Sequence, residues 1–197
     1  MKKDRAVLPT SPAAVDPQFG ESERHFRQMI DALPAAIYTT DADGRLTHFN
    51  PAAVKLSGRT PQIGTDEWCV SWKLYRPDGT PLPHDECPMA IALKQGRVNH
   101  GEEILVERPD GTRLWCTPFP TPVRDASGKV IGGINMLLDI TERKHAEQRL
   151  RDSEQRFTAF MEHLPGLAWI KDSDGRYVYA NDAAQRAFQT QGADLYG

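Results

Sequence analysis

The residues of this chain that could do chemistry are its three cysteines and a few histidines. Cys69, Cys87 and Cys116 are odd in number and far apart, which fits reduced thiols rather than a disulfide framework. His84 and Cys87 have a workable spacing for two metal ligands, but no second pair stands near them, so we expect no zinc site. No cysteine has a histidine and a carboxylate recurring around it, and no phosphate-binding loop is present. We therefore expect no catalytic residues in this chain.

Length, charge and hydropathy bound the class of protein. The chain has 197 residues, a net charge of -3 and a pI near 6.1, so it has no general attraction to nucleic acid phosphates. It contains no run of about 18 apolar residues that could span a bilayer, and its N-terminus lacks the apolar core of a signal peptide. We expect a cytoplasmic protein with no membrane segment and no nucleic acid partner.

One pattern occurs twice in the chain. The stretch "LPAAIYTTDADGRLTHFNPAA" (33–53) is echoed by "LPGLAWIKDSDGRYVYANDAA" (164–184) at an offset of 131 without a gap. Twelve of the 32 residues from 22 to 53 are identical to their partners at that offset. A helix, a hairpin and a capped helix are therefore duplicated, and we expect the second unit to be incomplete and unable to close a sheet.

The segments before and within the first copy carry helix and turn signals. Residues 1–21 contain several prolines and show no sustained periodicity of apolar residues, which predicts a flexible segment. Apolar residues at i, i+3, i+4 and i+7 then predict a helix over 22–33, with Ser22 as its N-cap. The stripe of this helix consists of Phe26, Met29, Ile30 and Leu33.

A five-stranded antiparallel sheet follows from the hairpin signals, which makes the fold class α+β. Asn50 before Pro51 predicts a capped helix that ends at Gly58. Residues 59–84 read as irregular, and Asp85 is expected to cap a helix that Gly96 ends. The expected strands are 35–40, 45–49, 102–108, 112–123 and 129–140, and the expected helices between them are 51–57 and 86–95.

A long, charged helix is expected after the last strand. Asp139 and Glu142 have the spacing of a capping box, and Thr141 is a second cap candidate. Apolar residues alternate in steps of four and three, which is typical of a coiled-coil seam, so this helix is expected to pair with another copy of itself. The seam consists of Ala146, Leu150, Ser153, Phe157, Phe160 and Leu164.

The chain resembles PAS domains, the sensory modules of bacterial signalling proteins. The resemblance rests on the repeated stretch, on "RPDGTRLW" (108–115), on "DITERKHAE" (139–147) and on the restart at "SEQRF" (153–157). It implies a PAS fold in which strands curl around a small pocket closed by helices. The implied organisation is a flexible segment over 1–21, a PAS domain with its C-terminal PAC part over 22–140, a connecting helix over 141–164 and the start of a second PAS domain over 165–197.

The resemblance also implies which strand residues point inward. Few of them are polar, so a ligand would be small and apolar or aromatic. A filled core without any ligand remains the alternative. The pocket residues that the resemblance implies are Tyr38, Ile104, Val106, Cys116, Asn135 and Leu137.

The opposite face of the sheet would then be unusually apolar and would need cover. The helix at 22–33 could supply this cover within a monomer, or a second protomer could supply it, and we expect a homodimer. The residues of this face are Leu105, Trp115, Phe119, Ile134, Met136 and Leu138.

Cofactors of related domains find little support in the sequence. Haem commonly needs an axial histidine, and His84 lies close to where haem-binding PAS domains carry theirs, but it reads as a loop residue. Flavin photochemistry needs a cysteine in a particular helix motif, from which Cys69 in "DEWCVSWK" departs. Val106, Cys116 and Leu137 replace the amide side chains that grip flavin. We expect neither cofactor.

The predicted function is sensory input for a signalling protein whose output domain lies outside this chain, with a two-component histidine kinase favoured. Asp139, Ile140 and Thr141 form the expected signal junction. His145 lies in an ordinary PAS exit helix, so we do not expect it to be a phosphoacceptor, and the chain itself is not expected to be an enzyme. The alternative is a ligand-free dimerisation module of a diguanylate cyclase, a phosphodiesterase or a transcription regulator.

Overall fold

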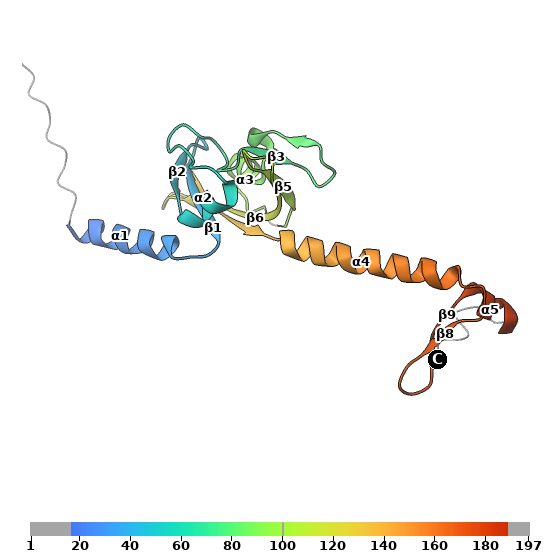
Figure 1. The fold of residues 1–197 in the computed structure, drawn as a ribbon. Coiled ribbons are helices and arrows are strands. Elements are labelled where there is room, and N and C mark those ends of the chain that lie inside the picture. The colour runs from blue at the N-terminus through green and yellow to red at the C-terminus, as the bar shows by residue number, and fades with distance from the viewer. Residues whose placement is uncertain (1–16, 100, 189–197) are drawn as a thin grey trace, which may run out of the picture. The chain divides into compact units, whose positions relative to one another are not determined.

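The computed structural model describes residues 17–99 and 101–188. It divides into two compact units, with the boundary between Ile140 and Thr141. Each unit is considered by itself below. Figure 1 labels most of the elements of the two units along the chain.

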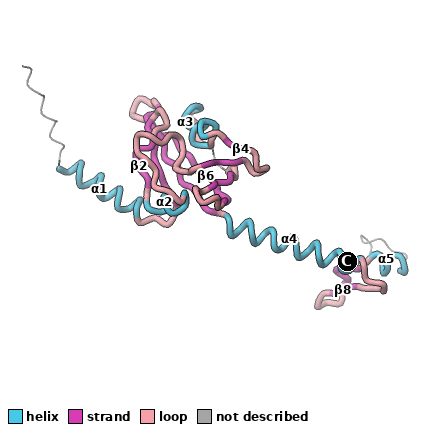
Figure 2. The backbone as a smooth tube through the Cα atoms, turned by 45° about the horizontal axis from the view of Figure 1, so that its top comes forward, coloured by secondary structure: helices cyan, strands magenta, loops and turns pink. Residues whose placement is uncertain are grey.

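The first unit is built on one antiparallel sheet with short helices, so the predicted α+β class is confirmed (Figure 2). The strand order across the sheet is β2-β1-β7-β6-β5-β3-β4, so that the first and last strands lie side by side. The seven strands are β1 (Ala36–Asp41), β2 (Leu46–Phe49), β3 (Lys73–Tyr75), β4 (Pro81–Leu82), β5 (Ile104–Glu107), β6 (Arg113–Arg124) and β7 (Val130–Asp139).

Two of these strands were not predicted, because residues 59–84 read as irregular. β3 has three residues and pairs with β5, and β4 has two residues and pairs with β3. Segments this short cannot show a period of two, and their pairing with β5 joins parts of the chain that are distant in sequence. Pro81 is tolerated because β4 is the edge strand of the sheet.

The helices of the first unit also differ in part from the prediction. α1 begins at Pro17, so Ser22 lies inside this helix and is not its cap; proline is well suited to a first helical turn. Residues 17–21 are therefore helical, while residues 1–16 of the expected flexible segment lie outside the described part of the chain. The helices are α1 (Pro17–Asp31), α2 (Pro51–Ser57), the 3-10 turn η1 (His84–Glu86) and α3 (Pro88–Gln95).

The cap predicted for α3 is also wrong. Asp85 lies within η1, and Cys87 occupies the N-cap position without a side-chain hydrogen bond, followed by Pro88 at the first helical position. Proline has no N–H to satisfy there, which lessens the need for a capping side chain. The predicted C-terminal signal is confirmed, since Gly96 is left-handed and closes the helix.

Asn50 is the predicted cap of α2, and it does more than cap. Its Oδ1 accepts hydrogen bonds from the backbone N–H of Ala53 at 3.0 Å and of Ile37 at 2.9 Å. Its Nδ2 donates to the carbonyl oxygens of Ile30 at 3.1 Å and Ala35 at 2.8 Å. One fully buried amide therefore joins the end of α1, strand β1 and the start of α2.

The second unit repeats this arrangement at the offset seen in the sequence. Asn181 Oδ1 accepts from the N–H of Ala184 and Ala168, and its Nδ2 donates to the carbonyl oxygens of Met161 and Gly166. The duplication therefore includes the hydrogen bonds of the buried amide. The elements of this unit are α4 (Thr141–Glu162), β8 (Trp169–Lys171), β9 (Tyr177–Ala180) and α5 (Asp182–Phe188).

The predicted seam of α4 is only partly within the helix. α4 ends at Glu162, so Leu164 lies beyond it and the connecting helix is shorter than predicted. Leu150 and Phe160 are exposed, and Phe157 makes an edge-to-face ring contact with Tyr179 of the same unit at 5.6 Å. Pairing of α4 with another copy stays a prediction.

Helix α3 packs closely onto the sheet because one strand residue has no side chain. A Cβ on Gly133 of β7 would lie 2.6 Å from Cε of Met89, which is fully buried. Glycine at this position therefore creates the space that the methionine fills. The close packing of α3 on β7 therefore depends on the Met89 side chain filling the space left by the missing side chain at Gly133.

Strand β6 carries prolines at alternate positions, Pro118, Pro120 and Pro122. β5 pairs with β6 only as far as Cys116, so these prolines lie where β6 has β7 as its neighbour. The intervening Phe119 N–H is directed toward β7, where it donates to Oδ1 of Asn135. Successive N–H groups of a strand alternate in direction, so the missing donors of the prolines face away from β7.

We predict that Asn50→Ala lowers the free energy of unfolding of the first unit by about 3 kcal/mol, because buried backbone groups lose their partners. Urea denaturation followed by circular dichroism measures this change. Asn99→Ala, in the segment after α3, serves as the control and is expected to stay within about 0.5 kcal/mol of the wild type. Equal stability of the two variants would contradict the prediction.

Candidate functional site

The interior of the first unit holds the six residues proposed from sequence as a pocket. All six are buried, and they come from β1, β5, β6 and β7. The inward phase expected for these strands therefore agrees with their burial. Whether they bind a ligand stays a prediction. The residues are Tyr38, Ile104, Val106, Cys116, Asn135 and Leu137.

Three hydrogen bonds connect the polar groups of this interior. Nδ2 of Asn135 donates to the Tyr38 hydroxyl at 2.9 Å, and this hydroxyl donates to the backbone carbonyl of Trp68, also at 2.9 Å. Oδ1 of Asn135 accepts from the N–H of Phe119 at 2.9 Å. The chain thus satisfies Tyr38 and Asn135 with its own groups and links β1, β7, β6 and the loop before β3.

The three cysteines lie in the same interior and are all buried. The thiol of Cys69 contacts the Ser71 hydroxyl at 3.3 Å, and that of Cys87 lies 3.8 Å from the Trp68 carbonyl oxygen. Burial raises the pKa of Cys87 from 9.0 to about 12 and also raises the pKa of Cys116. Since the thiolate is the nucleophile, burial makes these two thiols poor nucleophiles at neutral pH.

Burial likewise raises the pKa of Tyr38 well above 10.0, and the nearby thiols of Cys69 and Cys87 add to this effect. The phenol therefore stays protonated and remains a hydrogen-bond donor over the physiological range of pH. A neutral donor in an apolar interior suits a neutral acceptor such as a carbonyl oxygen.

Trp68 is a part of this site that the sequence did not indicate. Its φ is +65°, and no other residue except glycine has a positive φ in the described parts of the chain. No sequence signal points to this conformation, because tryptophan seldom adopts it. The role of Trp68 depends on its carbonyl, which any residue carries.

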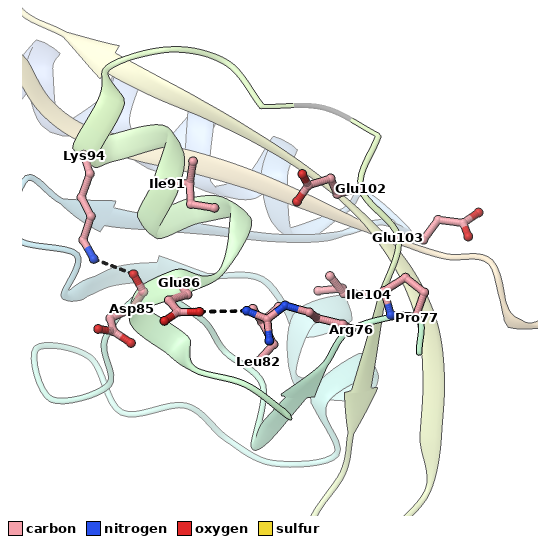
Figure 3. Close-up of a pocket in the computed structure, with 10 residues that line it drawn as sticks. All are labelled: Arg76, Pro77, Leu82, Asp85, Glu86, Ile91, Lys94, Glu102, Glu103 and Ile104. Atoms are coloured by element: carbon pink, nitrogen blue, oxygen red, sulfur yellow. Dashed lines mark hydrogen bonds and ion pairs between the residues drawn. The ribbon is translucent and has the colours of Figure 1, made fainter. Parts of the chain in front are cut away.

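A separate cleft of about 670 Å³ opens on the outer side of α3 (Figure 3). Arg76 donates to Glu86 at 2.8 Å, and the Lys94 ammonium donates to the backbone carbonyl of Asp85 at 2.5 Å. The cleft reaches the proposed pocket only at Ile104. Its volume is in the range of small-molecule sites, and its lining combines apolar and charged side chains. It is lined by Arg76, Pro77, Leu82, Asp85, Glu86, Ile91, Lys94, Glu102, Glu103 and Ile104.

Neither of the histidines considered for chemistry is among the six residues of the proposed pocket. His84 is in η1, and its Nε2 lies 3.1 Å from the carbonyl oxygen of Ser71. His145 lies on α4, in the second unit. Over residues 17–99 and 101–188, no three His, Cys, Asp or Glu side chains gather in a metal-binding set. The absence of a bound metal or haem nevertheless stays a prediction.

The outer face of the sheet remains partly exposed. Met136 and Leu138 of β7 are 36% and 45% exposed, whereas Trp115, Phe119, Ile134 and Leu105 are half-buried. The apolar stripe of α1 is also open, since Met29 is 55% exposed. Cover of the sheet face by the chain's own α1, one of the two expectations, is therefore absent from the described structure.

Comparison with known proteins identifies the family. The family model described as "PAS fold" matches residues 30–145, and a second, described as "PAS domain", matches residues 155–196. The chain belongs to the PAS family.

Two of its curated relatives are two-component proteins. The chain is 26% identical over 179 residues to the two-component sensor PprA of Pseudomonas aeruginosa, covering 87% of this chain and 18% of that protein. It is 27% identical over 124 residues to two-component system protein A of Emericella nidulans, covering 62% of this chain and 17% of that protein. The chain thus spans less than a fifth of the length of these relatives. These similarities support a role in signal sensing.

Among solved structures, the chain is similar to an RNA-binding light-oxygen-voltage receptor, with a TM-score of 0.52 and 22% identity over 80% of this chain and 43% of that one. At this identity the likeness shows the fold and transfers no cofactor. Val106, Cys116 and Leu137 carry no amide side chain that could hold a flavin, and the amide of Asn135 in the same interior is already bonded to Tyr38 and Phe119. That the protein carries no flavin stays a prediction.

None of the helices in the described segments has both the length and the apolar character needed to cross a bilayer.

The raised pKa values predict how stability depends on pH. Tyr38 and Cys87 hold their protons more tightly in the folded state than in the unfolded state. Their contribution to the free energy of unfolding is therefore complete below pH 9 and is lost as the pH rises toward 12. In Cys87→Ala, the free energy of unfolding is expected to fall less steeply with rising alkaline pH, by up to about 1.4 kcal/mol per pH unit. Urea titrations between neutral and alkaline pH measure it, and equal slopes for the variant and the wild type would contradict it.

Proposed function

We propose that the first PAS domain is the sensory input of a two-component signalling protein and that its signal leaves through α4. In this proposal the chain itself is not an enzyme, and catalysis belongs to an output domain, with a histidine kinase favoured. The similarity to two-component sensors supports this proposal, although the chain spans only a small part of those relatives.

The observation that carries the proposal is the bond between Asn135 and Tyr38. It joins β7 to β1 in the centre of the sheet, and it is buried. β7 ends at Asp139 and α4 begins at Thr141, so only Ile140 separates them. A change in the polar groups of the interior would therefore act on the strand that leads directly into α4.

Ile140 supports this role because it is fixed to the sheet. Its N–H donates to the carbonyl oxygen of Trp115 at 2.8 Å, and its side chain is buried. A shift of β6 or β7 would then move Ile140, the residue directly before α4 in the chain. Asp139, Ile140 and Thr141 remain the proposed signal junction.

We predict that Asp139→Ala uncouples input from output. Asp139 is exposed, so the free energy of unfolding should change by no more than about 0.5 kcal/mol. The stimulus-dependent change in autophosphorylation of the full-length protein that carries this chain should fall at least about fivefold. Glu154→Ala, at an exposed position of α4, is the matched control and should respond as the wild type does. An unchanged response of Asp139→Ala would refute the proposed junction.

A second candidate function is dimerisation without a ligand, and exposed apolar surface favours it. One chain presents both an apolar sheet face, at Met136 and Leu138, and an apolar helix stripe, at Phe26 and Met29. In a two-fold dimer, the helix of one protomer can cover the sheet of its partner. We propose a second copy of this chain as the occupant of both surfaces.

We predict that Met136→Glu weakens this dimer at least about tenfold, because a carboxylate would be buried at the interface. Native mass spectrometry over a dilution series measures the dissociation constant. Ile63→Glu, at a loop position that is 59% exposed, is the control and should leave it unchanged. A wild-type protein that is monomeric throughout the series would overturn the dimer.

A further inference from the structure

Residues 67–69 form a three-residue turn that is rarely seen and strained. The N–H of Cys69 donates to the carbonyl oxygen of Glu67 at 2.7 Å, and Trp68 between them has a φ of +65°. A γ-turn with a positive φ at its centre is uncommon, and a bulky side chain there adds to the cost. Such a turn persists only where surrounding contacts hold it.

The contacts that hold this turn come from several elements. The Trp68 N–H donates to the carbonyl oxygen of Gly44 at 2.7 Å, and the ring lies so close over Gly44 that a Cβ there would overlap it. The ammonium of Lys94 lies 5.3 Å from the ring centroid. On the inner side, the Trp68 carbonyl accepts the hydroxyl of Tyr38. The turn at residues 67–69 is thus held by contacts from the β1–β2 hairpin, from α3 and from the interior.

The turn also stands between the interior and the solvent. Cys69 lines an outer cavity of about 300 Å³, together with Ser71, Trp72 and His84. The same thiol lies close enough to Tyr38 to affect the pKa of its hydroxyl. Movement of residues 67–69 would therefore join this cavity to the buried polar groups.

We propose that the Trp68 carbonyl occupies the place of a ligand oxygen and that the strained turn is a closed gate. When the turn relaxes, the Tyr38 hydroxyl loses its acceptor and becomes a donor for an incoming molecule. Val106, Leu137 and Met89 belong to the same core as Tyr38 and are apolar and fully buried, which disfavours an anion. The ligand class is a small neutral molecule with a carbonyl oxygen on an apolar or aromatic frame. Only the signalling consequence of the gate rests on the proposed sensory function.

The three cysteines provide the test, because Cys69 and Cys87 flank the Trp68 carbonyl whereas Cys116 lies on β6. Gly44→Ala pushes a methyl into the Trp68 ring. Gly111→Ala imposes the same left-handed strain in another hairpin, where nothing lies within 4 Å of the new methyl. The full 197-residue chain is treated with iodoacetamide under native conditions, and the alkylated peptides are quantified by mass spectrometry.

Gly44→Ala is expected to alkylate at Cys69 and Cys87 about tenfold faster than Gly111→Ala, with Cys116 equally protected in both. Tyr38→Phe, which keeps the ring and removes the donor to Trp68, should give the same pattern to a smaller extent. Equal rates in the two glycine variants, or a parallel rise at Cys116, would overturn the gate.

The ligand class is tested on Gly44→Ala with acetophenone and with ethylbenzene, which has a similar shape but no carbonyl. Acetophenone is expected to slow alkylation of Cys69 at least about fivefold more than ethylbenzene does, and Tyr38→Phe in the same background should remove the difference. Equal protection by the two compounds would overturn the ligand class. These readouts do not involve output activity, so they are independent of the Asp139→Ala result.

Discussion

The first unit depends on the hydrogen bonds of one buried amide, that of Asn50. Its two polar atoms bind the end of α1, the first strand and the start of α2. The β1 strand held in this way pairs with β7, and that pairing sets Tyr38 opposite Asn135. Asn181 repeats the same set of bonds in the second unit, so the amide is the part of the duplicated segment that organises it.

Features with a local cause could be predicted from sequence. Asn50 followed by Pro51 specifies a helix start, and Gly58 and Gly96 take the left-handed conformation that ends a helix. The start of α1 was misjudged because Pro17, taken as a sign of flexibility, is compatible with a first helical turn.

Features with a non-local cause could not be predicted. The three residues of β3 are a strand only because β5 lies beside them, and Trp68 adopts its positive φ only because the hairpin, α3 and Tyr38 hold it. The inward phase of β5, β6 and β7 came from the family resemblance, since the last strand is apolar on both faces. The strand residues of the candidate site could therefore be predicted from the sequence, whereas the role of its loop residue, Trp68, could not.

The interior has implications for how strong a signal must be. A hydrogen bond such as the one from Tyr38 to Trp68 contributes about 1 kcal/mol, and strain in a turn of this kind is of order 1–3 kcal/mol in the opposite direction. The closed and relaxed forms of the loop can then differ by little. Weak binding of a small molecule would suffice to change their balance.

The prolines of β6 have a consequence for how the protein can meet other chains. Beyond the end of β5, one edge of β6 is not paired with β5. An unpaired strand edge ordinarily allows a foreign β-strand to add to the sheet by backbone hydrogen bonding. Because Pro118, Pro120 and Pro122 have no backbone N–H, β6 offers no hydrogen-bond donor to an added strand along that stretch. A strand added at that edge could therefore form only the hydrogen bonds that the β6 carbonyl groups accept, which makes the edge a poor site for pairing with another chain.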